Sequence, residues 1–139
     1  MGAQRKRRTG SSLFRITMFL VDSNIIVYSN LPQYEYLRNF FIDDLAAVSE
    51  ISRVEMLGYH KLTSKEERYF KNIFDFVTII TPSPEIFNTA ITIRKNYNLK
   101  LGDSIIAATA IIHDMPIYTR NLKDFNKIHD LNCIDSIKL

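Results

Sequence analysis

Four acidic side chains in this sequence lie where a predicted strand ends or a predicted helix begins. They are Asp22, Glu55, Asp103 and Asp124. Asp22 directly follows a short apolar run of the kind that forms a strand buried on both faces of a parallel sheet. In open α/β sheets, ligands bind at the edge formed by the carboxyl ends of the strands. A functional site around Asp22 therefore requires the other three acids to reach the same edge.

The chemistry available to such a group of acids is metal binding. Carboxylates that converge repel one another and are costly to desolvate unless a cation joins them. A site with oxygen ligands alone suits Mg²⁺ or Mn²⁺ rather than Zn²⁺. The histidines, His60, His113 and His129, show no metal-ligand spacing, and we interpret them as surface or helix-end residues.

Each acid also has an ordinary structural interpretation. Asp22 and Asp103 can each cap the helix that follows, and Asp124 can accept hydrogen bonds in a turn. Glu55 is the fourth residue of a Ser-x-x-Glu capping box that begins at Ser52. Because caps are commoner than metal ligands, only the joint occurrence of the four acids favours a shared site.

The helix predicted after Asp103 strengthens the functional interpretation. Residues 105–112 are apolar nearly all round, which predicts a buried helix. Its small residues, Ala107, Ala108 and Ala110, permit close packing against a sheet. An acid at the start of this helix is expected to lie against the core rather than in open water.

Predicted strands and helices alternate along the chain. Strands are expected at residues 19–21, 45–48, 76–80, 116–119 and 133–137. Helices are expected at residues 25–29, 33–43, 52–59, 63–74, 84–97 and 104–113, with a loop or short turn at 121–126. This alternation predicts an α/β fold with a mostly parallel sheet and no second domain.

Composition indicates an ordinary globular protein. The chain has 139 residues, of which 46% are hydrophobic and 24% charged, and no apolar run reaches the roughly 20 residues that cross a bilayer. A single cysteine, Cys133, excludes an internal disulfide framework and favours a cytoplasmic location. We interpret Cys133 as a small core residue rather than a nucleophile.

The positive net charge belongs to the start of the chain. Five of the 18 basic residues lie in residues 1–17, which contain no acid, so the other 13 face 15 acids. We expect residues 1–17 to be a disordered basic leader, whether an upstream extension, an early start before Met18 or an added remnant. A nucleic-acid-binding arm is the alternative. Residues 18–139 would then form the single domain.

Four segments together resemble the motifs of PIN-domain ribonucleases, most closely the VapC-type toxins of type II toxin–antitoxin systems. They lie at residues 21–24, 52–59, 102–110 and 118–125, in the order of the family. The first motif, Val-Asp-Ser-Asn, is weak alone. The third, with its alanine-rich continuation, and the Thr-Arg-Asn-x-x-Asp-Phe stretch of the fourth are fairly specific.

This resemblance implies a PIN-like three-layer sandwich, with a mostly parallel central sheet flanked by helices. It matches three residues to catalytic metal-binding acids: Asp22, Glu55 and Asp103. Some relatives carry the fourth acid at the place of Asn121 and others at the place of Asp124. We expect Asp124 to be the fourth catalytic and metal-site acid, acting through a water molecule. Asn121, Thr119 and Ser23 are expected to be polar supports.

The activity that the resemblance implies is hydrolysis of RNA phosphodiester bonds assisted by Mg²⁺ or Mn²⁺, leaving 5′-phosphate and 3′-hydroxyl ends. Such an ion lowers the pKa of a bound water and neutralises charge on the phosphate. An acidic site cannot attract RNA by itself. We therefore expect phosphate contacts from Arg53, Arg120 and Lys123, each of which is otherwise a solvated surface charge.

The implied partners are an antitoxin protein and a second copy of the chain. Segments 33–41 and 59–70 are rich in Tyr, Phe and Leu, and they form either a groove for an antitoxin helix or ordinary core. A haloacid-dehalogenase-type phosphatase would need a second aspartate where Asn24 stands, and the acidic pair of a receiver domain is not evident. The remaining alternative is a PIN-like domain that binds RNA or protein without cleaving.

Overall fold

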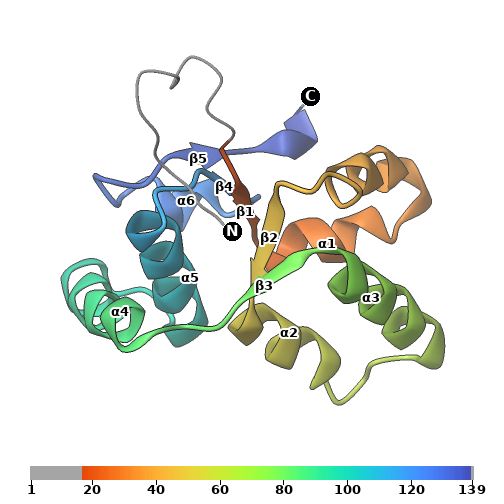
Figure 1. Cartoon of the computed structure of the whole chain (residues 1–139), viewed down its shortest axis with the longest axis horizontal. Helices are drawn as coiled ribbons and strands as arrows, with labels where there is room; N and C mark the ends of the chain where they lie inside the picture. The colour runs from red at the N-terminus through yellow and green to blue at the C-terminus, as the bar shows by residue number, and fades with distance from the viewer. Residues whose placement is uncertain (1–16, 139) are drawn as a thin grey trace.

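The computed structural model describes residues 17–138 (Figure 1). Most of the basic leader predicted at residues 1–17 lies outside this range. The described residues form a five-stranded sheet in the order β3-β2-β1-β4-β5, with every neighbouring pair parallel. The strands are β1 (Phe19–Val21), β2 (Ala46–Ser49), β3 (Thr78–Ile80), β4 (Ile117–Tyr118) and β5 (Cys133–Ile134).

Helices cover both faces of this sheet, which confirms the predicted three-layer α/β architecture (Figure 1). The α-helices are α1 (Ser23–Ser29), α2 (Glu50–Leu57), α3 (Ser64–Phe76), α4 (Pro84–Tyr97), α5 (Leu101–Ile112) and α6 (Leu122–Phe125). Two 3₁₀ helices, η2 (Pro32–Phe40) and η3 (Ser136–Lys138), complete the elements. One hydrophobic cluster lies under α4 and α5, and a second lies under α1, η2 and α3.

Strand β1 is central and buried on both faces, as its apolar sequence predicts. Leu20 belongs to the cluster under α4 and α5, whereas Val21 belongs to the opposite cluster. This alternation follows from the period of two in a strand. Leu20 pairs with Ala47 on one side and Ile117 on the other. The carboxyl end of β1 therefore opens at the middle of the sheet edge.

Helix α5 is buried along most of its length, which confirms the prediction from its apolar sequence. Residues 104–110 are all buried. Ala107 and Ala108 are fully inaccessible to solvent. Their small side chains let the helix axis approach the sheet closely, so the amino end of α5 is placed against the same sheet edge as the end of β1.

The capping box predicted at Ser52 is wrong. Helix α2 begins three residues earlier than that box requires, because the Ser49 side chain caps it by accepting a hydrogen bond from the Ile51 N–H at 3.1 Å. Ser52 is buried inside the helix, and its hydroxyl has no hydrogen-bond partner within residues 17–138. Glu55 therefore has no capping role, and the structural alternative for this acid disappears.

Helix α5 also begins earlier than predicted. Its N-cap is Lys100, and Asp103 lies in the first turn rather than at the cap. An acid in the first turn still interacts favourably with the positive end of the helix dipole. The cap predicted for Asp22 is confirmed, since its carboxylate accepts a hydrogen bond from the Ser23 N–H.

Three other elements differ from their predicted form. The strand predicted at 76–80 is shorter, because Phe76 is the last residue of α3. Phe76 is 76% exposed, and β3 is an edge strand of the sheet. The helix predicted at 33–43 is a 3₁₀ helix with non-helical backbone angles at Tyr34. The last predicted strand ends at Ile134 and gives way to η3.

We predict that alanine substitutions of Ser49 and Ser52 have different effects on stability. Ser49→Ala removes the cap of α2 and should lower the free energy of unfolding by about 1 kcal/mol. Ser52→Ala removes a hydroxyl that lacks a partner among the described residues, so it should leave stability unchanged or raise it. Urea unfolding of the two variants measures the difference. Equal losses in both would contradict this assignment of the cap.

Candidate active site

The site is built around the buried Asp22 carboxylate, which is only 4% exposed. Its Oδ1 accepts a hydrogen bond from the Ser23 N–H at 2.8 Å, and its Oδ2 accepts one from the Thr119 hydroxyl at 2.8 Å. Sheet register explains the second bond. Val21 pairs with Tyr118 across β1 and β4, so the next residue on each strand, Asp22 and Thr119, meet at the carboxyl edge.

Asn121 connects two further acids to this centre. Its backbone N–H donates to the Thr119 hydroxyl at 2.9 Å. Its side-chain amide donates to Asp103 Oδ2 at 3.4 Å and to Asp124 Oδ2 at 3.2 Å. The amide thus joins an acid from α5 to one from α6, and Asp124 also lies 3.8 Å from the Lys127 ammonium.

Glu55 approaches the same edge from α2, because Gly102 leaves room for its carboxylate. A methyl group at Gly102 would lie 2.5 Å from Glu55 Oε2. No side chain larger than hydrogen fits at that position unless Glu55 moves. The glycine in the first turn of α5 therefore allows the Glu55 and Asp103 carboxylates to lie near each other, although the Glu55 side chain is exposed on its other side.

The electrostatics indicate that these acids share one environment. Burial raises the pKa of Asp22 to about 6, and repulsion from Asp103 and Glu55 adds to the effect of burial, while the Thr119 hydrogen bond opposes it. Burial, then repulsion from Asp103, raises the pKa of Glu55. Burial, then repulsion from Asp124, raises the pKa of Asp103, which Lys100 partly counteracts. Asp103 thus interacts with each of the other three acids.

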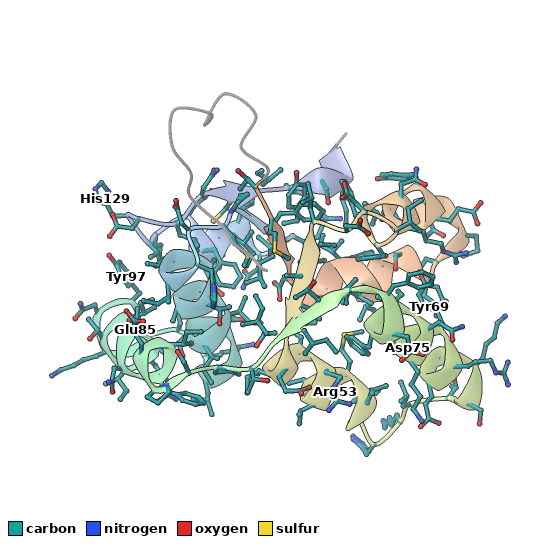
Figure 2. The ribbon with its side chains drawn as sticks, in the orientation of Figure 1. Arg53, Tyr69, Asp75, Glu85, Tyr97 and His129 are labelled. Carbon is teal, nitrogen blue, oxygen red and sulfur yellow. The ribbon has the colours of Figure 1, made fainter. Side chains whose placement is uncertain are left out.

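The three basic residues predicted to contact RNA lie in different surroundings. Arg53 forms an ion pair with Glu50 on α2, which raises the pKa of the guanidinium. Figure 2 shows Arg53 on α2, far from α6. Arg120 directly follows Thr119, and its guanidinium lies 5.2 Å from the centre of the Tyr28 ring. Lys123 is exposed on α6 and forms no ion pair within the described chain.

Ser23 contributes its backbone N–H, and its hydroxyl forms no hydrogen bond to another described residue.

Sequence reasoning missed Gly102 and Lys100. A glycine one position before an acid in a helix's first turn signals a close approach, and a lysine three residues before Asp103 signals charge compensation. Asn24 was also missed; its side-chain oxygen accepts a hydrogen bond from the Arg120 N–H at 3.3 Å.

The acids share one edge without forming a metal-binding cage. Within residues 17–138, no three Asp, Glu, His or Cys side chains lie close enough together to hold a metal ion. The histidines are exposed, and Figure 2 shows His129 at the periphery of the molecule. The structure places several oxygen-bearing groups at this edge. They are the buried Asp22 carboxylate, the more accessible carboxylates of Glu55, Asp103 and Asp124, the Thr119 hydroxyl and the Asn121 amide.

Comparison with known proteins gives one family and one group of structures. A family model for the PIN domain matches residues 19–131. A chain of a toxin–antitoxin complex from Klebsiella pneumoniae is 30% identical, with a TM-score of 0.68, over 84% of this chain and 96% of that one. No curated protein matches the chain.

Two further solved structures are similar at lower identity and support the fold alone. VapBC2 from Rickettsia felis, bound to a promoter DNA fragment, is 22% identical over 85% of this chain and 98% of that chain, with a TM-score of 0.69. FitAcB from Neisseria gonorrhoeae is 23% identical over 88% and 100%, with a TM-score of 0.71. Among the described residues, no helix combines the length and apolar character needed to span a membrane.

The raised pKa of Asp22 predicts how metal-free protein responds to pH. Its pKa rises from an ordinary 3.8 to about 6 on folding, so the unfolded chain releases this proton at lower pH than the folded chain. Stability should therefore fall as the pH rises through this interval, by up to about 3 kcal/mol. Asp22→Asn should remove this loss and be more stable than wild type at neutral pH.

Urea unfolding in EDTA across the acidic to neutral range measures this effect. The stability difference between Asp22→Asn and wild type should grow from about pH 4 to about pH 7. A difference that stays constant with pH would show that the carboxylate titrates alike in the folded and unfolded chains.

Proposed function

This chain belongs to the PIN-domain family, as the resemblance in its sequence predicts, and we propose that it is a metal-dependent endoribonuclease and the toxin of a toxin–antitoxin pair. One observation carries this proposal. The buried Asp22 carboxylate is held from two sides by hydrogen bonds and lies in the repulsive field of Asp103 and Glu55. Burying a carboxylate beside like charges costs stability, which is expected of a site that binds a cation.

The donor set fits Mg²⁺ or Mn²⁺. All the acids offer oxygen, and no cysteine or histidine lies among them in the described chain. Burial, together with repulsion between the acids, raises the pKa of Asp22, Glu55 and Asp103, and a divalent cation would offset both effects. Asp22, Glu55 and Asp103 would hold the ion once their side chains move closer together than they lie in this structure, with Asp124 acting through water. A bound divalent ion supplies a polarised water nucleophile and neutralises charge on the phosphate.

The chain's own residues would orient these groups. Thr119 and the Ser23 N–H fix both oxygens of Asp22, and Asn121 holds Asp103 and Asp124 from the other side. Preorganised groups of this kind cost no rearrangement when charge develops. Arg120 and Lys123, one and four residues after Thr119, are the cations available for the phosphates of the strand.

We also propose an antitoxin partner, because the similar chain from Klebsiella pneumoniae belongs to a toxin–antitoxin complex. We propose a homodimer because exposed apolar side chains remain on α4 and α5. Exposed apolar side chains lie on both sides of the sheet. On the side of α1, α2, α3 and η2 they are Val27, Leu31, Tyr36, Ile42, Val54, Tyr59 and Phe76, and on the side of α4 and α5 they are Phe87, Ile91 and Leu101. The first set suits an antitoxin helix. Only Tyr36 and Tyr59 of this set come from the segments at 33–41 and 59–70, whose other aromatic and leucine side chains pack into the core. The second set suits a second copy of the chain.

We predict RNA cleavage that requires both metal and the acids. Purified protein should cut single-stranded RNA with Mg²⁺ or Mn²⁺ and stop when EDTA is added. Asp22→Asn and Asp103→Asn should each lower the cleavage rate by at least about 100-fold, because each removes a ligand charge. Gel analysis of end-labelled RNA measures the rates.

The matched control is Asp75→Asn, which replaces an exposed acid on α3 far from α5 and α6 (Figure 2). It should cleave like wild type. Mg²⁺ or Mn²⁺ should also raise the melting temperature of wild type but not of Asp22→Asn, since the ion binds only the native site. Metal-independent cleavage, or full activity in Asp22→Asn, would overturn the proposal.

Gly102→Ala should separate activity from folding. The added methyl meets the flexible end of Glu55 rather than backbone, so Glu55 should swing away while stability changes by less than about 1 kcal/mol. Displacing one ligand should lower the cleavage rate by about 10- to 100-fold. In a Glu55→Ala background, Gly102→Ala should add no further loss, and an equal loss in both backgrounds would contradict the role of Gly102.

A further inference from the structure

We propose that Arg120 and Tyr28 form a stacking platform for an unpaired RNA base beside the carboxylate site. The choice of RNA rests on the proposed function. The platform itself rests on the position of Arg120 in the structure, and it would make this nuclease select nucleotides whose bases are not paired.

Arg120 lies directly next to the carboxylate site. The preceding residue, Thr119, donates the hydrogen bond to Asp22 at 2.8 Å. The Arg120 backbone N–H donates to Asn24 on α1 at 3.3 Å, and its guanidinium carbon lies 5.2 Å from the centroid of the Tyr28 ring. The side chain therefore reaches from the end of β4 to α1, along the border of the site.

Tyr28 begins a row of aromatic rings that leads away from this border. The Tyr34 ring packs edge-to-face against Tyr28 with centroids 5.2 Å apart, and the Tyr36 ring lies 6.4 Å from Tyr34. The Tyr36 hydroxyl donates to the Ile137 carbonyl at 3.2 Å, which fixes the far end of the row. Aromatic side chains beside a cation are the usual surface for binding single strands.

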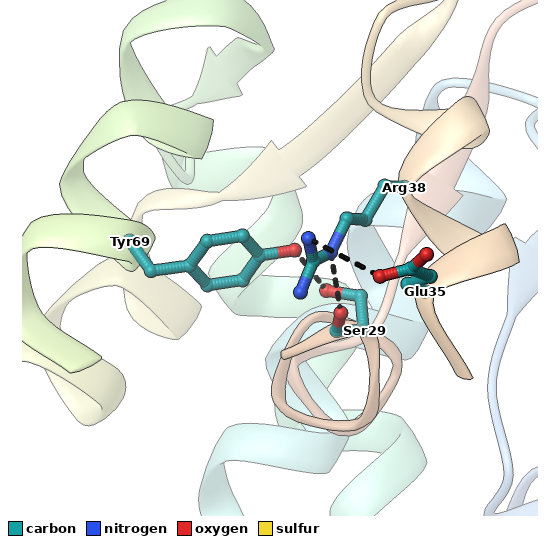
Figure 3. A network of polar contacts seen from close by, with 4 residues as sticks. All are labelled: Ser29, Glu35, Arg38 and Tyr69. Atoms are coloured by element: carbon teal, nitrogen blue, oxygen red, sulfur yellow. Dashed lines mark hydrogen bonds and ion pairs between the residues drawn. The ribbon is translucent and has the colours of Figure 1, made fainter. Parts of the chain in front are cut away.

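Arg38 shows by contrast why Arg120 is free to bind a ligand. Arg38 also lies over a tyrosine ring, at 5.0 Å from the centroid of Tyr69, but its Nε donates to the Ser29 carbonyl at 2.8 Å and its guanidinium lies 3.9 Å from Glu35 (Figure 3). Arg120 is exposed and forms no ion pair within residues 17–138. Its charge and its outer face remain available.

The end of α1 that carries Tyr28 is fixed by its neighbours before any ligand arrives. Ser29, the neighbour of Tyr28, shares a hydrogen bond of 2.8 Å with the Tyr69 hydroxyl on α3 (Figure 3). The Ser29 hydroxyl also donates to the Ile26 carbonyl at 2.6 Å. Together with Arg38, these contacts connect the end of α1 to both η2 and α3. A preformed surface loses little entropy on binding.

The chemistry of such a surface favours an unpaired base. A guanidinium plane and an aromatic ring both stack on bases, and each stacked base typically changes affinity by about 5- to 100-fold. A base in a duplex has its faces covered by neighbouring base pairs and cannot stack on Arg120. Charge alone would not make this distinction, because duplex phosphates are equally negative.

Arg120→Lys tests stacking, because lysine keeps the charge and removes the plane. The full-length chain carrying Asp22→Asn, with Mg²⁺ present, would be titrated into a labelled oligoadenosine of about ten nucleotides, within the usual range of site sizes. Fluorescence anisotropy should show that Arg120→Lys weakens binding by at least about fivefold. The dependence of affinity on salt should stay unchanged, since the number of charges does.

Three controls make the result specific. Arg68→Lys, which replaces an exposed arginine on α3, should not change the affinity. Tyr28→Leu should weaken binding as Arg120→Lys does, whereas Tyr28→Phe, which keeps the ring, should not. An oligomer of the same length without bases should bind the Asp22→Asn protein with the same affinity whether or not it also carries R120K. Thermal unfolding verifies that each variant is folded.

The outcomes separate this inference from the proposed function. Any of three results would overturn the platform. R120K and its Asp22→Asn parent could bind the oligoadenosine with equal affinity, R120K could lose as much affinity for the oligomer without bases as for the oligoadenosine, or the protein could bind no RNA at all. If the platform is confirmed while the wild type cleaves no RNA, the inference stands and the proposed function fails. If wild type cleaves RNA and R120K binds normally, only the platform fails.

Discussion

The structure of this site depends on one interaction, the hydrogen bond between the Thr119 hydroxyl and the buried Asp22 carboxylate. It joins the ends of two neighbouring parallel strands, so it exists only when β1 and β4 pair in the observed register. It also stabilises a charge that burial and nearby acids oppose. A carboxylate placed there without such donors would be expected to stay protonated.

The surrounding residues reduce the free-energy cost of placing these acids close together. An amide, Asn121, stands between Asp103 and Asp124 and donates to both without adding a negative charge. Asn121 is therefore a neutral hydrogen-bond bridge between the two acids. Lys100 and Lys127 add positive charge at the rim.

Local sequence signals predicted the elements well where one signal acts alone. The helix expected from residue 63 is capped by Thr63 through a capping box, and the helix expected to end at residue 97 ends there, before Asn98 with its positive φ of 54°. Prediction failed where two signals compete. Ser49 and Ser52 are both suitable N-caps three residues apart, and in the folded chain Ser49 caps the helix while Ser52 is buried inside it. In η2, the apolar residues predicted an α-helix, whereas the structure has a 3₁₀ helix interrupted at Tyr34 and in contact with α1.

The sequence by itself determined that Asp22 follows a buried strand, that Asp103 lies near the start of a helix, and that α5 is buried, because these properties follow from neighbouring residues and their periodicity. Only the tertiary structure decided that Asp22 contacts Thr119, 97 residues away, that Gly102 admits the Glu55 carboxylate, and that Arg120 lies over Tyr28. Those contacts depend on strand register and helix placement, which arise from packing the whole core rather than from any local stretch of chain.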